Sequence, residues 1–379
     1  MCSKIAHCGP DYKVPLFSTL RKKLVSGAKV DIDEYVASVK KAWVKGGCTI
    51  MSDTWSYRRQ RSFINVAAYS PSGAVFLKAT GFSGERHTSI KIKDIISLVI
   101  DDVGPQYVVQ IVTDNATNYT AVGEMLVVST QTRCAAQGIQ LLLKDIYEQV
   151  ELVHNMLESI LDVENELRML VACTEWREIA YSKSVAARNT TDIIQRQDCW
   201  EEGNNVKKVF EPLVGVLRLV DGEGSTSGYL YEAIERVCEG IKNIACENPS
   251  KYARILHLFK ARREENIIHD VHEAAAFLKS AFMYNDEFNE TPGIKAGITY
   301  MADFLVAEEE KLDFLREVQL LFSPTAISML QTAHPRIWWD YCGDSLPCLE
   351  RHAVRILSQP CSSSSSSVCE RHWSGFEAA

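Results

Sequence analysis

The first part of the chain mixes short apolar runs with apolar positions at helical spacing. Side chains such as Tyr35, Val39 and Trp43 recur at helical intervals and indicate amphipathic helices, whereas β-branched and aromatic runs bounded by turn residues indicate strands. The nearly continuous apolar run at 107–113 is typical of a strand that is covered on both faces. The pattern predicts helices at about 31–44, 89–103 and 117–128, and strands at about 48–51, 63–68, 74–77 and 107–113.

The second part of the chain has almost no strand pattern. Helical spacing runs through 134–170, interrupted at most near Gly138, and continues to about residue 330. The segments 207–220, 229–244 and 301–322 are the longest amphipathic helices predicted there. The chain is therefore predicted to be a mixed α/β block followed by a long all-α block.

The end of the chain differs from both blocks. Residues 354–357 form a predicted helix or strand, the serines at 362–367 follow, and a short helix begins at about Val368. A serine run is typical of a flexible linker, but these serines could also cap a helix whose first turn carries Glu370.

Composition narrows the classes of function. The 379 residues carry a net charge of −8, so a nucleic acid would have to be held by local basic patches. No apolar run reaches the roughly 18–20 residues of a membrane span, and residues 1–10 lack the apolar core of a signal peptide. The 12 cysteines are therefore expected to be reduced thiols, and their spacing gives no support for a zinc site or zinc finger.

Two aspartates follow or end predicted strands. If the strands that carry Asp53 and Asp114 are neighbours in one sheet, the two carboxylates can face each other. Paired carboxylates in such a place bind Mg²⁺ or Mn²⁺, because hard cations prefer oxygen ligands and neutralise the repulsion between the charges. The alternative is that each aspartate only caps a turn or a helix.

Three other groups of residues are candidates for a site. The basic turn of Arg58, Arg59 and Arg61 could contact a DNA backbone or be a solvated hairpin tip. The histidines at 269 and 272 could ligate a metal, although a partly exposed helix face is favoured. The tryptophans at 338 and 339 could stack on a base, although buried packing between the two blocks is favoured.

Five ordered segments carry a resemblance to a known family. The chain resembles plant proteins of the hAT (hobo/Ac/Tam3) transposase superfamily that contain the domain of unknown function 659 and a C-terminal hAT dimerisation region. The segments are GCTIMSDTWSYRRQRSFINVAAYSPSGAVFLKA, VVQIVTDNATNY, CAAQGIQLLLKDI, FEPLVGVLRLVDGE and AVRILSQPCSSSSSSVCERHWSGFE.

The resemblance implies a fold and a division into domains. It implies an RNase H-like catalytic core of the α/β class, interrupted by a long all-α insertion. The expected domains are an N-terminal basic segment and helix at 1–44, the core at 45–146, the insertion at 147–344, and a C-terminal segment that returns to the core at 345–379.

The resemblance also implies a catalytic site of the DDE type. Asp53, Asp114 and Glu370 match its three acids and are expected to be metal ligands for Mg²⁺ or Mn²⁺. DNA and a second copy or a related hAT protein are the expected partners, and a nuclear or cytoplasmic location in a plant is expected. No membrane or secretory role is expected.

Departures from the family pattern bear on activity. Gln137 stands where family members have the histidine of a Cys-x-x-His block, no BED-type zinc finger precedes Asp53, and the chain stops shortly after Glu370. We therefore expect a transposase-derived protein whose ancestral activity, metal-dependent cleavage and joining of DNA strands, is degenerate or lost. The alternative is a non-enzymatic nuclear protein that acts in dimerisation or in transcription-associated interactions.

Overall fold

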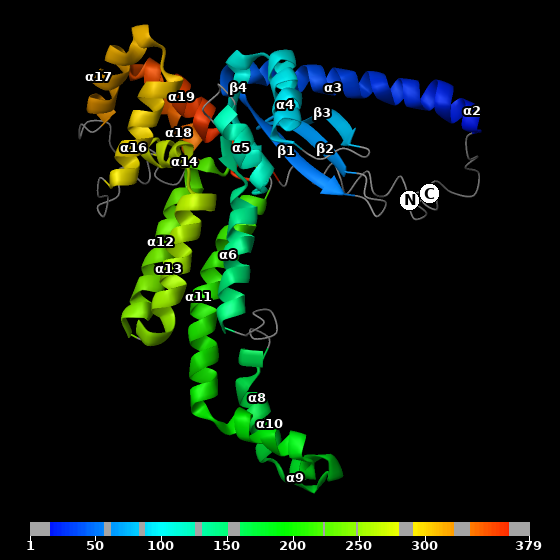
Figure 1. The fold of residues 1–379 in the computed structure, drawn as a ribbon, viewed down its shortest axis with the longest axis vertical. Coiled ribbons are helices and arrows are strands. Elements are labelled where there is room, and N and C mark those ends of the chain that lie inside the picture. The colour runs from blue at the N-terminus through cyan, green and yellow to red at the C-terminus, as the bar shows by residue number, and fades with distance from the viewer. Residues whose placement is uncertain are drawn as a thin grey trace.

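The computed structural model divides into a block built on a β-sheet and a larger helical block with an elongated arm (Figure 1). It describes residues 16–56, 62–82, 88–125, 131–150, 160–222, 224–247, 249–279, 291–321 and 334–363. No helix in these ranges is long and apolar enough to cross a membrane. The mixed α/β class predicted from the sequence is confirmed.

The sheet has five strands in the order β3-β2-β1-β4-β5. The first three form an antiparallel meander, whereas β4 pairs with β1 and β5 pairs with β4 in parallel. All residues of β4 are buried, as the apolar run predicted. The strands are β1 (Cys48–Ser56), β2 (Ser62–Ser70), β3 (Gly73–Phe82), β4 (Val108–Thr113) and β5 (Gln131–Arg133).

Helices cover the two faces of the sheet. Ile111 of β4 packs in one apolar cluster with residues of α3 (Val25–Gly46), α4 (Ser89–Val103) and α5 (Thr117–Met125). The next residue, Val112, points to the opposite face and packs in the cluster that includes α6 (Ala135–Val150). The sheet is therefore an inner layer, and α6 connects it to the helical block.

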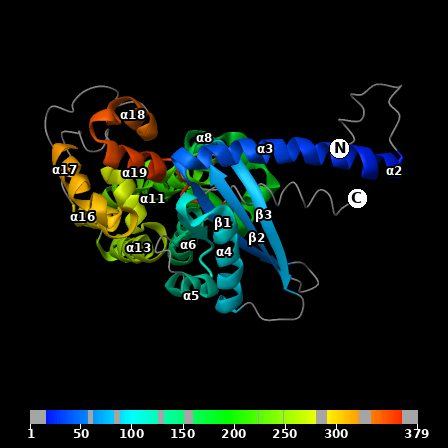
Figure 2. The same cartoon turned by 90° about the horizontal axis from the view of Figure 1, so that it is seen from above.

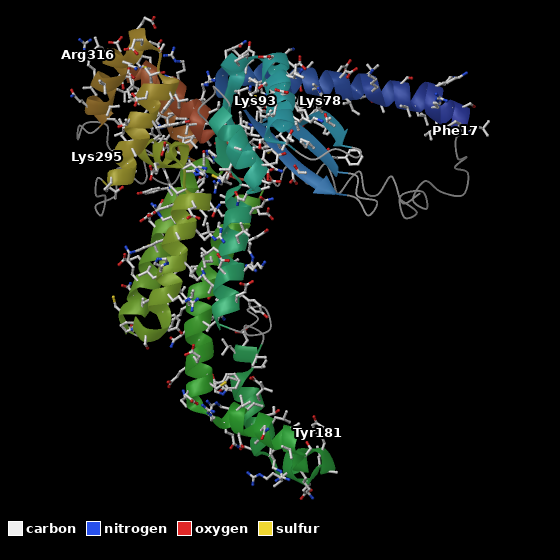
Figure 3. All side chains as sticks on the ribbon, viewed as in Figure 1. Phe17, Lys78, Lys93, Tyr181, Lys295 and Arg316 are labelled. Carbon is white, nitrogen blue, oxygen red and sulfur yellow. The ribbon has the colours of Figure 1, made fainter. Side chains whose placement is uncertain are left out.

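Helix α3 is longer than the sequence pattern predicted. It continues the short α2 (Phe17–Thr19) and the π-helical turn η1 (Leu20–Leu24), and it ends at Gly46, followed by the cap residue Gly47, whose φ of 65° suits glycine. The C-terminal half packs on the sheet through Val39 and Trp43, and the N-terminal half extends away from the body toward Phe17 (Figures 2 and 3).

The helical block contains the long arm. Helices α6 and α11 run along the arm, and α8, α9 and α10 lie at its far end, near Tyr181 in Figure 3. The helices are α8 (Glu164–Ala172), α9 (Thr174–Glu178), α10 (Val185–Gln195), α11 (Gln197–Asp221), α12 (Ser227–Glu247), α13 (Pro249–Arg262), α14 (Asp270–Phe277), α16 (Pro292–Tyr300), α17 (Lys311–Leu321), α18 (Pro335–Cys342) and α19 (Pro347–Leu357). Short 3₁₀ or π turns are η2 (Pro105–Tyr107), η3 (Ala180–Lys183), η4 (Arg263–Ile267), η5 (Met301–Leu305), η6 (Glu308–Glu310) and η8 (Gly343–Ser345).

Three sequence expectations were wrong in detail. Helix α3 begins before the predicted start at about residue 31, whereas α6 runs through Gly138 without a break, in agreement with the predicted helical spacing. The helix predicted at 301–322 is broken at Val306, whose backbone is extended, and a new turn begins at the acidic Glu308. Strand β5 was missed, since three residues with two polar ends give no periodic pattern.

The chain returns to the sheet after α19. Gln359 donates to the Gly46 carbonyl at 2.8 Å and accepts from the Thr49 hydroxyl at 2.8 Å, and the Pro360 carbonyl accepts from Gln110 Nε2 at 2.6 Å. The backbone N–H of Ala135 donates to the Cys361 carbonyl at 2.9 Å. This segment lies on the α6 face of the sheet and runs toward the carboxyl ends of β1 and β4.

The serine run begins inside the protein. Ser362 and Ser363 are only 2% and 4% exposed, so the first two serines are not a solvated linker. Cys48, Cys134 and Cys361 are buried in the part of the chain that the structure describes. The division into four domains stays a prediction.

Candidate metal centre

Asp53 and Asp114 lie at the same edge of the sheet. Ser52 of β1 pairs with Thr113 of β4 in parallel register, so the residues that follow them are neighbours where the pairing of the two strands ends. Asp114 follows the last residue of β4, whereas Asp53 lies inside β1, which continues to Ser56 by pairing with β2 and is longer than the sequence predicted. Because side chains alternate along a strand, both aspartates share a face with Met51 and Val112, which is the face covered by α6 and the returning segment. The structure thus brings together the two acids predicted from the sequence.

The two carboxyl groups influence each other. Burial raises the pKa of Asp114 to about 6, the Asp53 carboxylate adds to this rise, and the N–H groups of Ala116 and Thr54 oppose it. Burial also raises the pKa of Asp53, while the Thr54 N–H, 2.8 Å from Asp53 Oδ1, lowers it. A pair of partly buried carboxylates that repel each other is a place where a bound cation lowers the free energy.

A hydroxyl network lies on the opposite face of β1. The Tyr119 hydroxyl is 2.8 Å from Ser52 Oγ and 3.0 Å from Thr54 Oγ1. Tyr119 is 1% exposed, and burial raises its pKa to about 12, so it remains neutral. Sequence reasoning missed this network, although the alternation of hydroxyls at 52 and 54 was a signal that they share one face of the strand.

Gln137 lies beside the Asp114 loop. Its Oε1 accepts a hydrogen bond from the Asn115 N–H at 3.0 Å, and the Cys134 N–H donates to the Thr113 carbonyl at 2.8 Å. The start of α6 therefore fixes the loop that carries Asp114. The side-chain Oδ1 of Asn115 is buried and has no hydrogen-bond partner among the described residues.

The groups at this edge fit a hard divalent cation. The two carboxylates offer oxygen ligands, which Mg²⁺ and Mn²⁺ prefer. Glu370, the third acid of the expected triad, lies outside the described residues.

The histidines and tryptophans that were candidates from the sequence have structural roles in the described part of the chain. His272 is fully buried rather than on a partly exposed face, and its Nδ1 accepts from the His269 N–H in a reciprocal cap of α14. His269 Nε2 accepts from the Arg133 N–H at 3.1 Å and so holds β5. Trp338 and Trp339 are buried, as predicted, and Trp339 donates to the Leu278 carbonyl of the helical block, whereas packing between the two blocks stays a prediction. Arg58, Arg59 and Arg61 lie outside the described residues.

Comparison with known proteins agrees with part of the sequence resemblance. Residues 15–163 match the family model described as a domain of unknown function (DUF659), which occurs in hAT-like transposase-related proteins of plants. The match covers less than half of the chain, but it includes the whole sheet, both aspartates and Gln137. No curated protein matches the chain.

Proposed function

We propose that this chain is a hAT transposase-derived protein that binds Mg²⁺ or Mn²⁺ through Asp53 and Asp114. The observation that carries the proposal is the placement of both aspartates directly after Ser52 and Thr113, the last residues that pair between the parallel strands β1 and β4. The mixed five-stranded sheet, the helical block and the return of residues 359–363 to the sheet support an RNase H-like core split by an insertion.

Bound cations in such a site would activate the attacking oxygen and stabilise the leaving oxygen during phosphoryl transfer. The protein's own part is to hold the carboxylates. The Thr54 and Ala116 N–H groups orient them, and the buried strands β1 and β4 keep them adjacent. Glu370 is proposed as the third ligand, because the returning segment runs toward this edge of the sheet before it reaches that residue.

DNA is the proposed partner, held by local positive charge. A cavity of about 400 Å³ at the far end of the arm is lined by Trp176, Arg177, Lys183 and Arg188 among others. Cationic side chains and an aromatic ring are the groups that hold a nucleic-acid backbone and its bases. With DNA as the proposed partner, the proposed location is the nucleus.

We propose that strand cleavage and joining are lost in this chain. Gln137 occupies the position of the family's histidine, and its side chain is used to fix the Asn115 backbone. An amide cannot take up or release a proton near neutral pH, so it cannot replace an imidazole in acid–base chemistry.

A non-enzymatic interaction protein is the second candidate. The N-terminal half of the long helix exposes large apolar side chains, among them Phe17 at 74% and Ile32 at 59%. Exposed apolar surface of this kind marks an interface with another protein, such as a second copy or a related hAT protein.

Binding of Mn²⁺, measured by electron paramagnetic resonance of the free ion, tests the proposal. The wild-type chain should bind Mn²⁺, and the Asp53→Asn/Asp114→Asn variant should lose that binding. The matched control is Asp101→Asn/Asp102→Asn, two exposed acids at the end of α4, and it should bind like the wild type. Equal binding by all three proteins would contradict the proposal and favour the interaction protein.

The loss of activity needs a separate assay. Plasmid nicking and oligonucleotide joining in Mn²⁺ should give no product above a blank with the wild-type chain. Product that disappears in the Asp53→Asn/Asp114→Asn variant would show an active enzyme and overturn the inference from Gln137.

A further inference from the structure

A second group of potential metal ligands lies in the helical block, away from the sheet. Cys348 and His352 are four residues apart in α19 and therefore lie on one face of that helix. Glu310 ends the turn η6, directly before α17, which packs against α19. One ligand atom from each of the three residues lies within 4.8 Å of the others.

Two of these side chains are buried. Cys348 is 7% exposed and His352 is 8% exposed. The Nε2 atom of His352 is buried and has no hydrogen-bond partner among the described residues. Burying an imidazole nitrogen without a partner costs free energy, and coordination of a metal ion by this nitrogen would offset that cost.

The backbone around Cys348 is already fixed. The buried Glu317 of α17 accepts hydrogen bonds from the N–H groups of Cys348 at 3.2 Å and Leu349 at 2.7 Å. These bonds cap the first turn of α19 and hold the thiol and the imidazole in place relative to α17. A preorganised donor pair loses little conformational entropy when it binds a ligand.

The Arg351 side chain contacts two of these three residues. Its guanidinium lies 2.6 Å from Glu310 Oε2 and 3.9 Å from Cys348 Sγ. The arginine side chain is 50% exposed, and ion pairs with that much solvent contribute at most about 1 kcal/mol. Arg351 can therefore swing into solvent when a metal takes its place. Arg355, one turn further along, donates instead to the Gln106 carbonyl at 2.7 Å.

We propose that Glu310, Cys348 and His352 bind a Zn²⁺ ion. A thiolate, an imidazole and a carboxylate are the donor set that zinc selects, with water in the fourth tetrahedral position. Tetrahedral zinc holds its donors roughly 3.5 Å apart, so small side-chain rotations suffice to bring ligand atoms that lie within 4.8 Å of one another to this separation. The ion would tie α17 to α19, the helix from which the chain returns to the sheet.

This site could not be predicted from the sequence, because Glu310 is distant in sequence from the Cys-x-x-x-His pair. The proposal does not depend on the acidic pair at the sheet. Zinc binding should therefore be unchanged in the Asp53→Asn/Asp114→Asn variant, and this variant separates a failure of one site from a failure of the other.

Zinc competition with a chromophoric chelator tests the proposal on the full chain after removal of metals. Cys348→Ser and Glu310→Gln should each weaken Zn²⁺ binding by at least about tenfold. Matched controls are Cys246→Ser at an exposed thiol of α12 and His257→Gln on α13, which should bind like the wild type. Equal affinities for wild type, site variants and controls would overturn the proposal.

Cobalt provides a second readout. Co²⁺ added to the metal-free wild type should give thiolate-to-cobalt charge-transfer absorption that is lost in Cys348→Ser and kept in Cys246→Ser. Absorption that survives in Cys348→Ser would overturn the assignment of the thiol. Circular dichroism of each metal-free variant establishes that it is folded, and Glu310→Gln, in a partly exposed turn, supplies a test if a buried variant unfolds.

Discussion

Gln137 supports the backbone beside Asp114, because its side-chain Oε1 accepts the Asn115 N–H at 3.0 Å. The residue that departs from the hAT pattern thus has a structural role at the candidate metal centre. The polar side chain at this position connects the first turn of α6 to the loop that follows β4.

Removing that side chain should destabilise the protein. In Gln137→Ala the partly buried Asn115 N–H loses its partner, which costs about 1–3 kcal/mol. Gln140→Ala, at an exposed position of the same helix, should change the free energy of unfolding by less than about 0.5 kcal/mol. Urea unfolding measures the free energy of unfolding of both variants. Equal effects would show that the hydrogen bond between Gln137 and the Asn115 N–H contributes nothing to stability.

The Asp114 carboxyl should make stability depend on pH. Its pKa is about 6 in the folded protein against an ordinary value of 3.8, so the folded state binds the proton more tightly than the unfolded state. Proton binding by Asp114 therefore stabilises the folded state, and this contribution is fully present below about pH 4 and is lost as the pH rises through 6. Its size is on the order of 2–3 kcal/mol.

The comparison with Asp114→Asn isolates this effect. In metal-free buffer the variant should gain stability relative to the wild type between pH 4.5 and 7. Asp101→Asn, at an exposed position, should show no such relative gain. Parallel pH profiles of the free energy of unfolding for the wild type and Asp114→Asn would mean that burial and Asp53 do not raise the pKa of Asp114.

The Tyr119 hydroxyl should contribute to the stability of β1. Tyr119→Phe leaves the Ser52 and Thr54 hydroxyls without this partner and should cost about 1–2 kcal/mol. Tyr147→Phe, at a side chain that is 42% exposed, should be near neutral. Thermal or urea unfolding distinguishes the two, and a neutral Tyr119→Phe would show that the network is replaced by water.

Two glycines in helices should respond to alanine in opposite directions. In Gly138→Ala the new Cβ would lie 2.7 Å from the Asn266 carbonyl, and overpacking of this kind costs about 1–3 kcal/mol. Gly215→Ala in α11 meets nothing within 4 Å and should stabilise the helix by about 0.5–1 kcal/mol. Changes of the same sign in unfolding experiments would contradict the packing of α6 on η4.

The sequence predicted the parts of the fold that depend on local periodicity. Helix α4 matched at both ends, and β4 was buried on both faces, because the apolar spacing at 89–103 and 107–113 is clear. The extended backbone at Val306 and the burial of His272 could not be predicted, since both depend on tertiary contacts.

Of the residues described at the candidate metal centre, the sequence predicted the two aspartates and not their contacts. Strand-end positions indicated Asp53 and Asp114, and their adjacency followed once β1 and β4 were neighbours. The contact of Gln137 with Asn115 and the approach of Glu310 to Cys348 join residues that are distant in sequence. No local pattern encodes such contacts.

Thermal unfolding in the presence and absence of Mg²⁺ or Mn²⁺ tests the central claim most directly. Without metal, Asp53→Asn/Asp114→Asn should be at least as stable as the wild type, because the two repelling charges are gone. With metal at about a hundred times its Kd, the wild type should gain about 2.7 kcal/mol, a rise of a few degrees in Tm, and the variant should gain nothing. An equal response of both proteins to the metal would contradict the assignment of Asp53 and Asp114 as its ligands.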